Sequence, residues 1–250
     1  TDLSQVLPRG WEPDLVVSIS GGGIPMFINT CSLRCPAVFI SVDTWQCLAD
    51  YSEARFYDVV FTAQREFVEH LRATGSRHVY WLPLACNPDA HFPVPEQEET
   101  DDIAFVGAAS LSVHAERARL LRLLEDNFSV IRAERVHGAE MCRIFARGRL
   151  AFNHAAVREL NMRIFEVLAI GRPLLTNSES AYNGLLDLFE EDKHLIIYRD
   201  EKDLLKKACR YLENEKLRLD VATAGRAEVL ANHTYRSRVQ ALIAQVRALY

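Results

Sequence analysis

Long apolar runs, an excess of basic charge and paired metal ligands are all missing from this sequence of 250 residues. Its most apolar stretches, residues 36–42 and 194–198, have the length of a β-strand, whereas a membrane helix needs about 20 apolar residues. The formal net charge of −5 disfavours a nucleic-acid partner, because such binding relies on basic side chains that neutralise phosphates. We therefore expect a globular chain with no transmembrane segment and no nucleic-acid partner.

Zinc-type cysteine spacing and the pattern of an export signal are missing as well. Cys31 and Cys35 have three residues between them instead of two, and no second Cys or His pair follows at zinc spacing. The first residues contain no basic segment followed by an apolar one, so we expect no signal peptide. These features predict reduced thiols in a cytoplasmic protein that uses no metal and no other cofactor. Because the chain does not begin with Met, a processed or trimmed N-terminus is also considered.

Short β-branched segments alternate with longer helical patterns along the whole chain, in which 49% of the residues are hydrophobic. Continuously apolar strands separated by helices predict an α/β fold with parallel sheets that are covered on both faces. The expected strands are residues 14–20, 37–42, 58–62, 78–82, 102–106, 128–132, 150–153, 173–177 and 194–198. The expected helices are residues 64–74, 114–125, 139–146, 161–170, 185–189, 201–214, 215–232 and 237 to the end.

The best candidate for a linker is residues 87–102, which contain three prolines and a cluster of acids. We expect a first α/β domain at residues 1–95, short or truncated at its N-terminus, and a second at 96–234. A final helix at 235–250 would pack back on the first domain through Leu242, Ile243 and Val246. Two such domains bind ligands at the carboxyl ends of their strands, in the crevice between them.

The most informative segment is the helix expected at residues 161–170, which Asn161 would cap at its start and Gly171 at its end. Arg163 lies in the first turn, where a cation opposes the helix dipole at a cost of about 0.3–1 kcal/mol. A phosphate held by Arg163 and the free N–H groups explains this placement. Glu166, one turn further on, would accept hydrogen bonds from a ribose or sugar diol. The alternative is an ion pair of Arg163 with Glu166 or Glu159.

Small residues follow two of the expected strands. Gly107, Ala108 and Ala109 follow the strand at 102–106, where they allow a ligand to approach backbone N–H groups. Gly21, Gly22 and Gly23 follow the first strand, and Met26 stands where a dinucleotide fingerprint requires its third glycine. We consider the three as a loop at the inter-domain cleft. In both places an ordinary turn is the alternative.

Two polar residues stand at other strand ends. Asp43 follows the second strand, where a carboxylate can deprotonate an acceptor hydroxyl, and Trp45 beside it can stack on a sugar. The alternative for Asp43 is an N-cap of the next helix. His154 ends the strand at 150–153, either as a structural residue or beside the phosphates.

At residues 165–177 the sequence FEVLAIGRPLLTN resembles a helix–strand segment in the C-terminal domain of GT-B glycosyltransferases. More broadly, residues 102–235 resemble the C-terminal domain of CgeB-like (spore maturation protein) glycosyltransferases. The segments that carry this resemblance are IAFVG at 103–107, LNMRIFEVLAIG at 160–171, YRDEKDLLKKA at 198–208 and HTYRSR at 233–238. Residues 43–92 resemble the second half of the N-terminal domain of the same group. The resemblance implies two Rossmann-like domains that face each other across a cleft.

The resemblance also implies roles for individual residues. Arg163 would contact the diphosphate of a nucleotide sugar and Glu166 its ribose, and the loop at His137 and Gly138 would border the base. Some retaining relatives have seven residues between two glutamates, but six separate Glu159 from Glu166, so we assign Glu159 no role. The expected donor-binding residues are Gly107, Ala108, Ala109, His137, Gly138, Asn161, Met162, Arg163, Ile164 and Glu166.

We therefore expect a glycosyltransferase of the hexosyltransferase type, with Asp43 and Arg163 as catalytic residues. It would move a sugar from a nucleotide diphosphate sugar to an unidentified hydroxyl-bearing acceptor. No convincing acidic pair for a metal is present, so Arg163 and the helix N-terminus would stabilise the departing diphosphate without one. The alternatives are a nucleotide-sugar epimerase or hydrolase of the same fold, and a non-catalytic nucleotide-sugar-binding protein.

Overall fold

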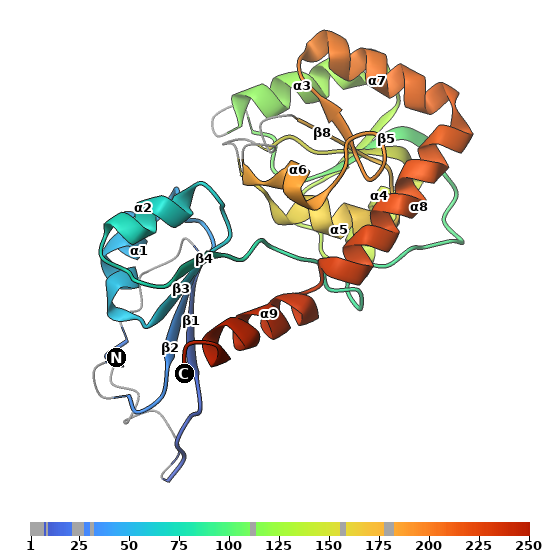
Figure 1. Cartoon of the computed structure of the whole chain (residues 1–250). Helices are drawn as coiled ribbons and strands as arrows, with labels where there is room; N and C mark the ends of the chain where they lie inside the picture. Colours follow the sequence, from blue (N-terminus) through green and yellow to red (C-terminus); the bar gives the residue numbers. More distant parts are fainter. Residues whose placement is uncertain are drawn as a thin grey trace. The chain divides into compact units, whose positions relative to one another are not determined.

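A computed structural model describes residues 8, 10–21, 28–30, 33–110, 114–155, 159–177 and 183–250 (Figure 1). The chain forms two compact units. Unit 1 contains Thr1–Pro83 and Arg238–Tyr250, and unit 2 contains Leu84–Ser237. The division follows Pro83, so residues 87–102, which we expected as a linker, belong to unit 2, and the last turns of the chain belong to unit 1.

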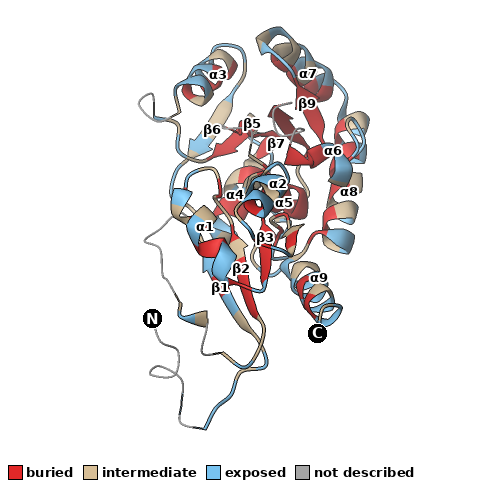
Figure 2. Cartoon of the chain, turned by 60° about the vertical axis from the view of Figure 1, so that its left-hand side comes forward, coloured by how far each residue is buried: buried red, intermediate tan, exposed pale blue. Residues whose placement is uncertain are grey.

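Unit 1 is built on a parallel sheet of four strands in the order β1-β2-β3-β4. The strands are β1 (Val16–Ser20), β2 (Ala37–Ser41), β3 (Val59–Thr62) and β4 (Val79–Trp81). Their crossovers contain the short helices α1 (Leu48–Glu53) and α2 (Phe67–Ala73). The middle strands β2 and β3 are almost entirely buried, which is the reason for their continuously apolar sequences (Figure 2).

The last helix, α9 (Tyr235–Arg247), completes the core of unit 1 with its C-terminal half. Leu242 and Val246 pack against Val38, Val59 and Phe61 of the sheet. Ile243, which we expected in the same contact, is 36% exposed. It lies about 100° around the helix from Leu242, so the two side chains do not share one face.

Unit 2 contains a parallel sheet of five strands in the order β6-β5-β7-β8-β9. The strands are β5 (Asp101–Val106), β6 (Val130–Ala133), β7 (Gly148–Phe152), β8 (Leu174–Asn177) and β9 (Ile196–Tyr198). The helices are α3 (Ala115–Glu125), α4 (Gly138–Arg147), α5 (Met162–Ile170), α6 (Leu185–Leu188), α7 (Glu201–Glu213) and α8 (Glu215–Asn232). Helices α3 and α7 pack on one core with the strands, and α5 packs against α8.

Every strand expected from the sequence is present, with ends that differ by at most two residues from the expected ones. The α/β prediction is therefore confirmed. In unit 2 the chain passes from β5 outward to β6 and then returns to the other side of β5 as β7. This reversal creates a switch point between the carboxyl ends of β5 and β7, which is where open α/β sheets bind ligands.

Candidate functional site

A cavity of about 220 Å³ lies at the switch point of unit 2. Its walls come from the end of β5, the end of β7 and the first turns of α3 and α5. The lining residues are Phe105, Val106, Gly107, Arg117, Asn153, Asn161, Met162, Arg163 and Glu166. The structure thus brings together Gly107, Asn161, Met162, Arg163 and Glu166, all of which we expected in the donor site.

Helix α5 begins and ends at the expected residues. Asn161 is the N-cap, with extended backbone angles, and Gly171 ends the helix in the left-handed conformation with φ +81°. The Asn161 side chain, however, makes no capping hydrogen bond, contrary to expectation. Its Nδ2 donates to Oδ1 of Asn153 at 3.2 Å, and its Oδ1 is buried without a hydrogen-bond partner. An amide oxygen at the cavity wall is therefore available to a ligand that donates a hydrogen bond.

Arg163 makes the ion pair that we considered as the alternative to phosphate binding. Its Nη1 donates to Oε2 of Glu166 at 2.7 Å and also contacts Sδ of Met141. The guanidinium lies 5.6 Å from the centre of the Phe145 ring. The Arg163 side chain is 20% exposed and that of Glu166 only 7%. Burial lowers the pKa of Arg163, while the charge of Glu166 opposes that effect.

His91 is a member of this cluster that we did not anticipate. Its Nδ1 accepts the N–H of Asn87 at 3.3 Å, so in the neutral ring the proton is on Nε2. Nε2 lies 3.3 Å from Oε1 of Glu166. Burial raises the pKa of Glu166, but the hydrogen bond from His91 and the charge of Arg163 outweigh it and lower the pKa overall. Glu166 is therefore a buried carboxylate that stays ionised.

Arg117 is the second cation of the cavity, and it was also not anticipated. Its Nε and Nη2 donate to the main-chain oxygen of His154 at 3.0 and 2.7 Å, and its Nη1 donates to that of Ala108 at 2.9 Å. It thereby ties the end of β7 to the end of β5. Burial lowers the pKa of Arg117, although the charge of Glu159 opposes this. In the sequence Arg117 is one of several arginines in an amphipathic helix, and nothing there distinguishes it.

The other residues that we expected in the donor site take different positions. Gly107 has φ +157°, and a Cβ there would lie 3.2 Å from the Phe105 ring. Ala108 contributes the oxygen bound by Arg117, and the N–H of Ala109 donates to Oε1 of Glu134 at 3.0 Å. Ile164 is fully buried, and it is not among the residues that line the cavity.

His137 and Gly138 lie at the start of α4 and do not line the cavity. Gly138 has φ +53°, a conformation that suits glycine. His137 is exposed, and its charge is one of the influences that lower the pKa of Glu166. His137 is therefore close enough to Glu166 to act on it electrostatically.

Asp43, which we expected as the catalytic base, is in unit 1 and follows β2 in the sequence. Helix α1 takes Cys47 as its N-cap with no side-chain cap, so the N-cap alternative for Asp43 is wrong. Burial raises the pKa of Asp43, and the negative charge of Asp50 raises it further. Asp50 is 1% exposed and accepts hydrogen bonds from Ser20 at 2.7 Å and Ser41 at 2.5 Å. Nothing in the sequence singled out Asp50.

Two of the glycines expected at a cleft, Gly22 and Gly23, lie outside the described residues. Gly21 directly follows β1 and is exposed. No cysteine among the described residues forms a disulfide, and Cys47, Cys86 and Cys142 are buried while Cys209 is exposed.

Among the described residues, no group of three or more His, Cys, Asp or Glu side chains is arranged to hold a metal ion. No helix in the part of the chain that the structure describes is long and apolar enough to cross a bilayer.

The chain was compared with known protein families, curated sequences and solved structures. The family described as "Glycosyl transferase-like" matches residues 100–244, more than half of the chain. A search of curated protein sequences finds no match. Solved structures of glycosyltransferases with the GT-B fold resemble the chain along most of its length, at identities that establish the fold alone.

Three of these structures have TM-scores between 0.61 and 0.66 against this chain. HepE of Anabaena, solved with UDP-glucose, has a TM-score of 0.66 and 11% identity over 94% of this chain and 79% of its own. Sucrose-phosphate synthase of Thermosynechococcus elongatus has a TM-score of 0.62 and 13% identity over 88% of this chain and 69% of its own. TarM of S. aureus, in a complex that contains UDP, has a TM-score of 0.61 and 11% identity over 86% of this chain. The chain spans only 52% of the length of that TarM structure.

Proposed function

The chain belongs to the glycosyl transferase-like family, and from this premise we propose that it transfers a sugar from a nucleoside diphosphate sugar to a hydroxyl-bearing acceptor. We further propose that it is a CgeB-like member, on the strength of residues 103–107, 160–171 and 233–238. HepE and TarM, which share its fold, were solved with UDP-glucose and UDP. The observation that carries the proposal is the cavity at the switch point, which two partly buried arginines and the start of α5 line together.

The proposed donor diphosphate binds beside Arg117, Arg163 and the N-terminus of α5. Negative charge develops on this group as the glycosidic bond breaks, and fixed cations with a helix N-terminus stabilise it. The ion pair with Glu166 is compatible with this role, because a guanidinium has five N–H donors and only Nη1 contacts Glu166. Glu166 would accept a hydrogen bond from the ribose, and Asn161 Oδ1 supplies a second acceptor.

Asp43 is proposed as the base that takes the proton of the acceptor hydroxyl. A partly buried carboxylate with a raised pKa is better matched to this task than a fully exposed one. Asp50, which helps to raise that pKa, is itself held by two serine hydroxyls. The acceptor is not specified by these features.

The test of the proposal combines ligand binding with product analysis. Nucleoside diphosphate sugars of different bases are screened by thermal shift, and a true donor at a hundredfold excess over its Kd should add about 2.7 kcal/mol of stability. The donor is then incubated with and without acceptor hydroxyl compounds. Transfer only in the presence of an acceptor supports the proposal. Sugar release or epimerisation without one favours a hydrolase or epimerase, and binding without any turnover favours a binding protein.

Removal of divalent metals is expected to leave the transfer rate unchanged. The charge on the departing diphosphate would be stabilised by Arg117, Arg163 and the start of α5, which EDTA does not affect. The rate is measured before and after EDTA treatment and again after addition of Mn²⁺. A rate that collapses with EDTA and recovers with Mn²⁺ would contradict the metal-independent mechanism.

A further inference from the structure

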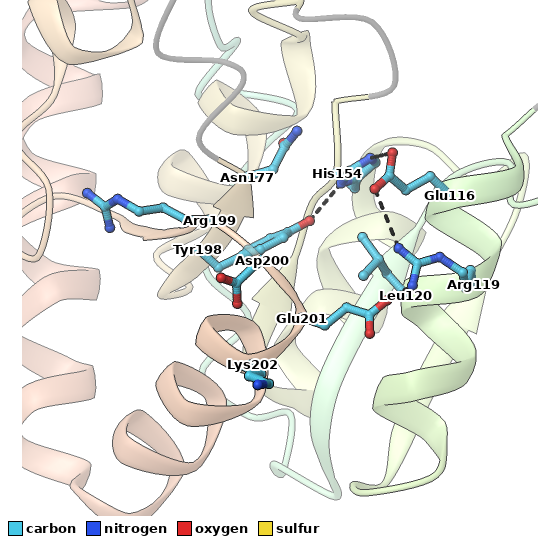
Figure 3. Close-up of a pocket in the computed structure, with 10 residues that line it drawn as sticks. All are labelled: Glu116, Arg119, Leu120, His154, Asn177, Tyr198, Arg199, Asp200, Glu201 and Lys202. Carbon is cyan, nitrogen blue, oxygen red and sulfur yellow. Dashed lines mark hydrogen bonds and ion pairs between the residues drawn. The ribbon is translucent and has the colours of Figure 1, made fainter.

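A second, larger cavity of about 530 Å³ lies in unit 2 at the carboxyl ends of β7, β8 and β9. Its lining residues are Glu116, Arg119, Leu120, His154, Asn177, Tyr198, Arg199, Asp200, Glu201 and Lys202 (Figure 3). The proposed donor chemistry uses none of these side chains. The two cavities are nonetheless linked, because Arg117 of the smaller one donates to the main-chain oxygen of His154 in the larger one.

The charges around this larger cavity balance. Its lining contains three acidic and three basic side chains. Arg119 pairs with Glu201 and lies 3.6 Å from Glu116. Arg199 pairs with Glu191, which does not line the cavity, through two contacts of 2.7 and 2.9 Å. Asp200 caps α7 by accepting the N–H of Asp203. A lining with equal numbers of acidic and basic side chains offers many hydrogen-bonding groups but little net charge, which suits a neutral polar ligand better than an ion.

The imidazole of His154 is the lining group whose protonation and hydrogen bonding are best defined. It is 4% exposed, and burial lowers its pKa to about 4, so the ring is uncharged at neutral pH. Nδ1 lies 2.7 Å from the hydroxyl of Tyr198. With that hydroxyl as donor, the ring proton is on Nε2, which faces Oε2 of Glu116 at 3.9 Å, as Figure 3 shows. This distance is too long for a direct hydrogen bond.

A ligand hydroxyl fits this pair of groups, because it can accept from Nε2–H and donate to the carboxylate at the same time. A stacked nucleobase does not fit, since the Tyr198 ring is 3% exposed and packs between Phe152 and His154. We propose that this cavity binds a neutral, hydroxyl-rich ligand, a sugar, with Glu116 and His154 recognising one of its hydroxyls. Given the proposed function, the sugar is either the group carried by the donor or part of the acceptor.

The experiment compares Glu116→Gln with Glu125→Gln. Both residues are on α3 and each has one arginine ion pair, but Glu125 pairs with Arg132 and does not line the cavity. The Glu116 side chain is 60% exposed, so the change should not disturb folding. Calorimetry measures the affinity for UDP, UDP-glucose, UDP-N-acetylglucosamine and the methyl glycosides of both sugars. The glycosides are tested alone and with UDP.

If the sugar of the donor occupies the cavity, E116Q weakens binding of a UDP-sugar about tenfold, the loss of one hydrogen bond to a charged group, and leaves UDP unaffected. If an acceptor sugar occupies it, E116Q weakens binding of a glycoside and leaves the UDP-sugars unaffected. E125Q changes neither. The proposal is overturned if E116Q behaves like E125Q with every compound, or if no sugar adds affinity in the wild type. Failure of every nucleoside diphosphate to bind, whatever its base, would count against the proposed function, while the glycosides would still decide the role of the cavity.

Discussion

Arg163→Ala is expected to weaken binding of nucleoside diphosphates about a hundredfold, since charge-assisted hydrogen bonds contribute up to about 3 kcal/mol each. The same variant should lose about 3 kcal/mol of unfolding free energy, because it leaves the carboxylate of Glu166 buried without its cation. Calorimetry measures the first effect and urea unfolding the second. Both effects follow from one side chain that is an ion-pair partner and lines the cavity.

Two further variants separate those roles. Arg172→Ala removes an arginine that is 16% exposed and pairs with Glu99 at 2.6 Å, but that does not line the cavity. It should cost stability without changing nucleotide affinity. The double variant Arg163→Ala/Glu166→Gln should regain part of the lost stability, because no unpaired charge is buried, yet it should not regain affinity. If Arg163→Ala binds nucleotides as well as the wild type does, Arg163 is only a structural residue and the proposed function loses its main support.

Gly225→Ala is expected to destabilise the protein by about 2–3 kcal/mol, the cost of overpacking a rigid contact. Gly225 is in the middle of α8, where the sequence alone predicts the opposite sign, since alanine is favoured over glycine in a helix by about 0.5–1 kcal/mol. In the structure a Cβ at this position would lie 2.3 Å from the main-chain oxygen of His194 and 2.9 Å from Cδ2 of Leu168. Leu168 belongs to α5, so the substitution also strains the helix that carries Arg163.

The matched control is Thr223→Ala, at an exposed position of the same helix. It should be neutral or slightly stabilising, as helix propensity predicts. Urea unfolding of the wild type and both variants gives the three free energies. A gain of stability in Gly225→Ala would show that α8 and the segment at His194 can move apart, and that the close packing of α8 does not fix α5.

The local features of the candidate site could be predicted because they depend on neighbours in the sequence. Continuously apolar segments predicted the strands, and Asn161 and Gly171 predicted both ends of α5. The Arg163–Glu166 contact was predictable because residues three apart are neighbours on a helix. The same reasoning was wrong for Ile243, since an apolar helical residue can face either the core or its edge, and only packing partners decide which.

The sequence by itself thus determined the α/β class, the strands and the helix that begins beside the cavity, because backbone geometry and burial act over a few residues. Only the tertiary structure decided the strand order β6-β5-β7-β8-β9, which creates the switch point. It also joined His91 to Glu166 and Arg117 to His154, pairs that are distant in the chain. Such contacts depend on which strands become neighbours, and that choice is made by the packing of the whole unit rather than by any local pattern.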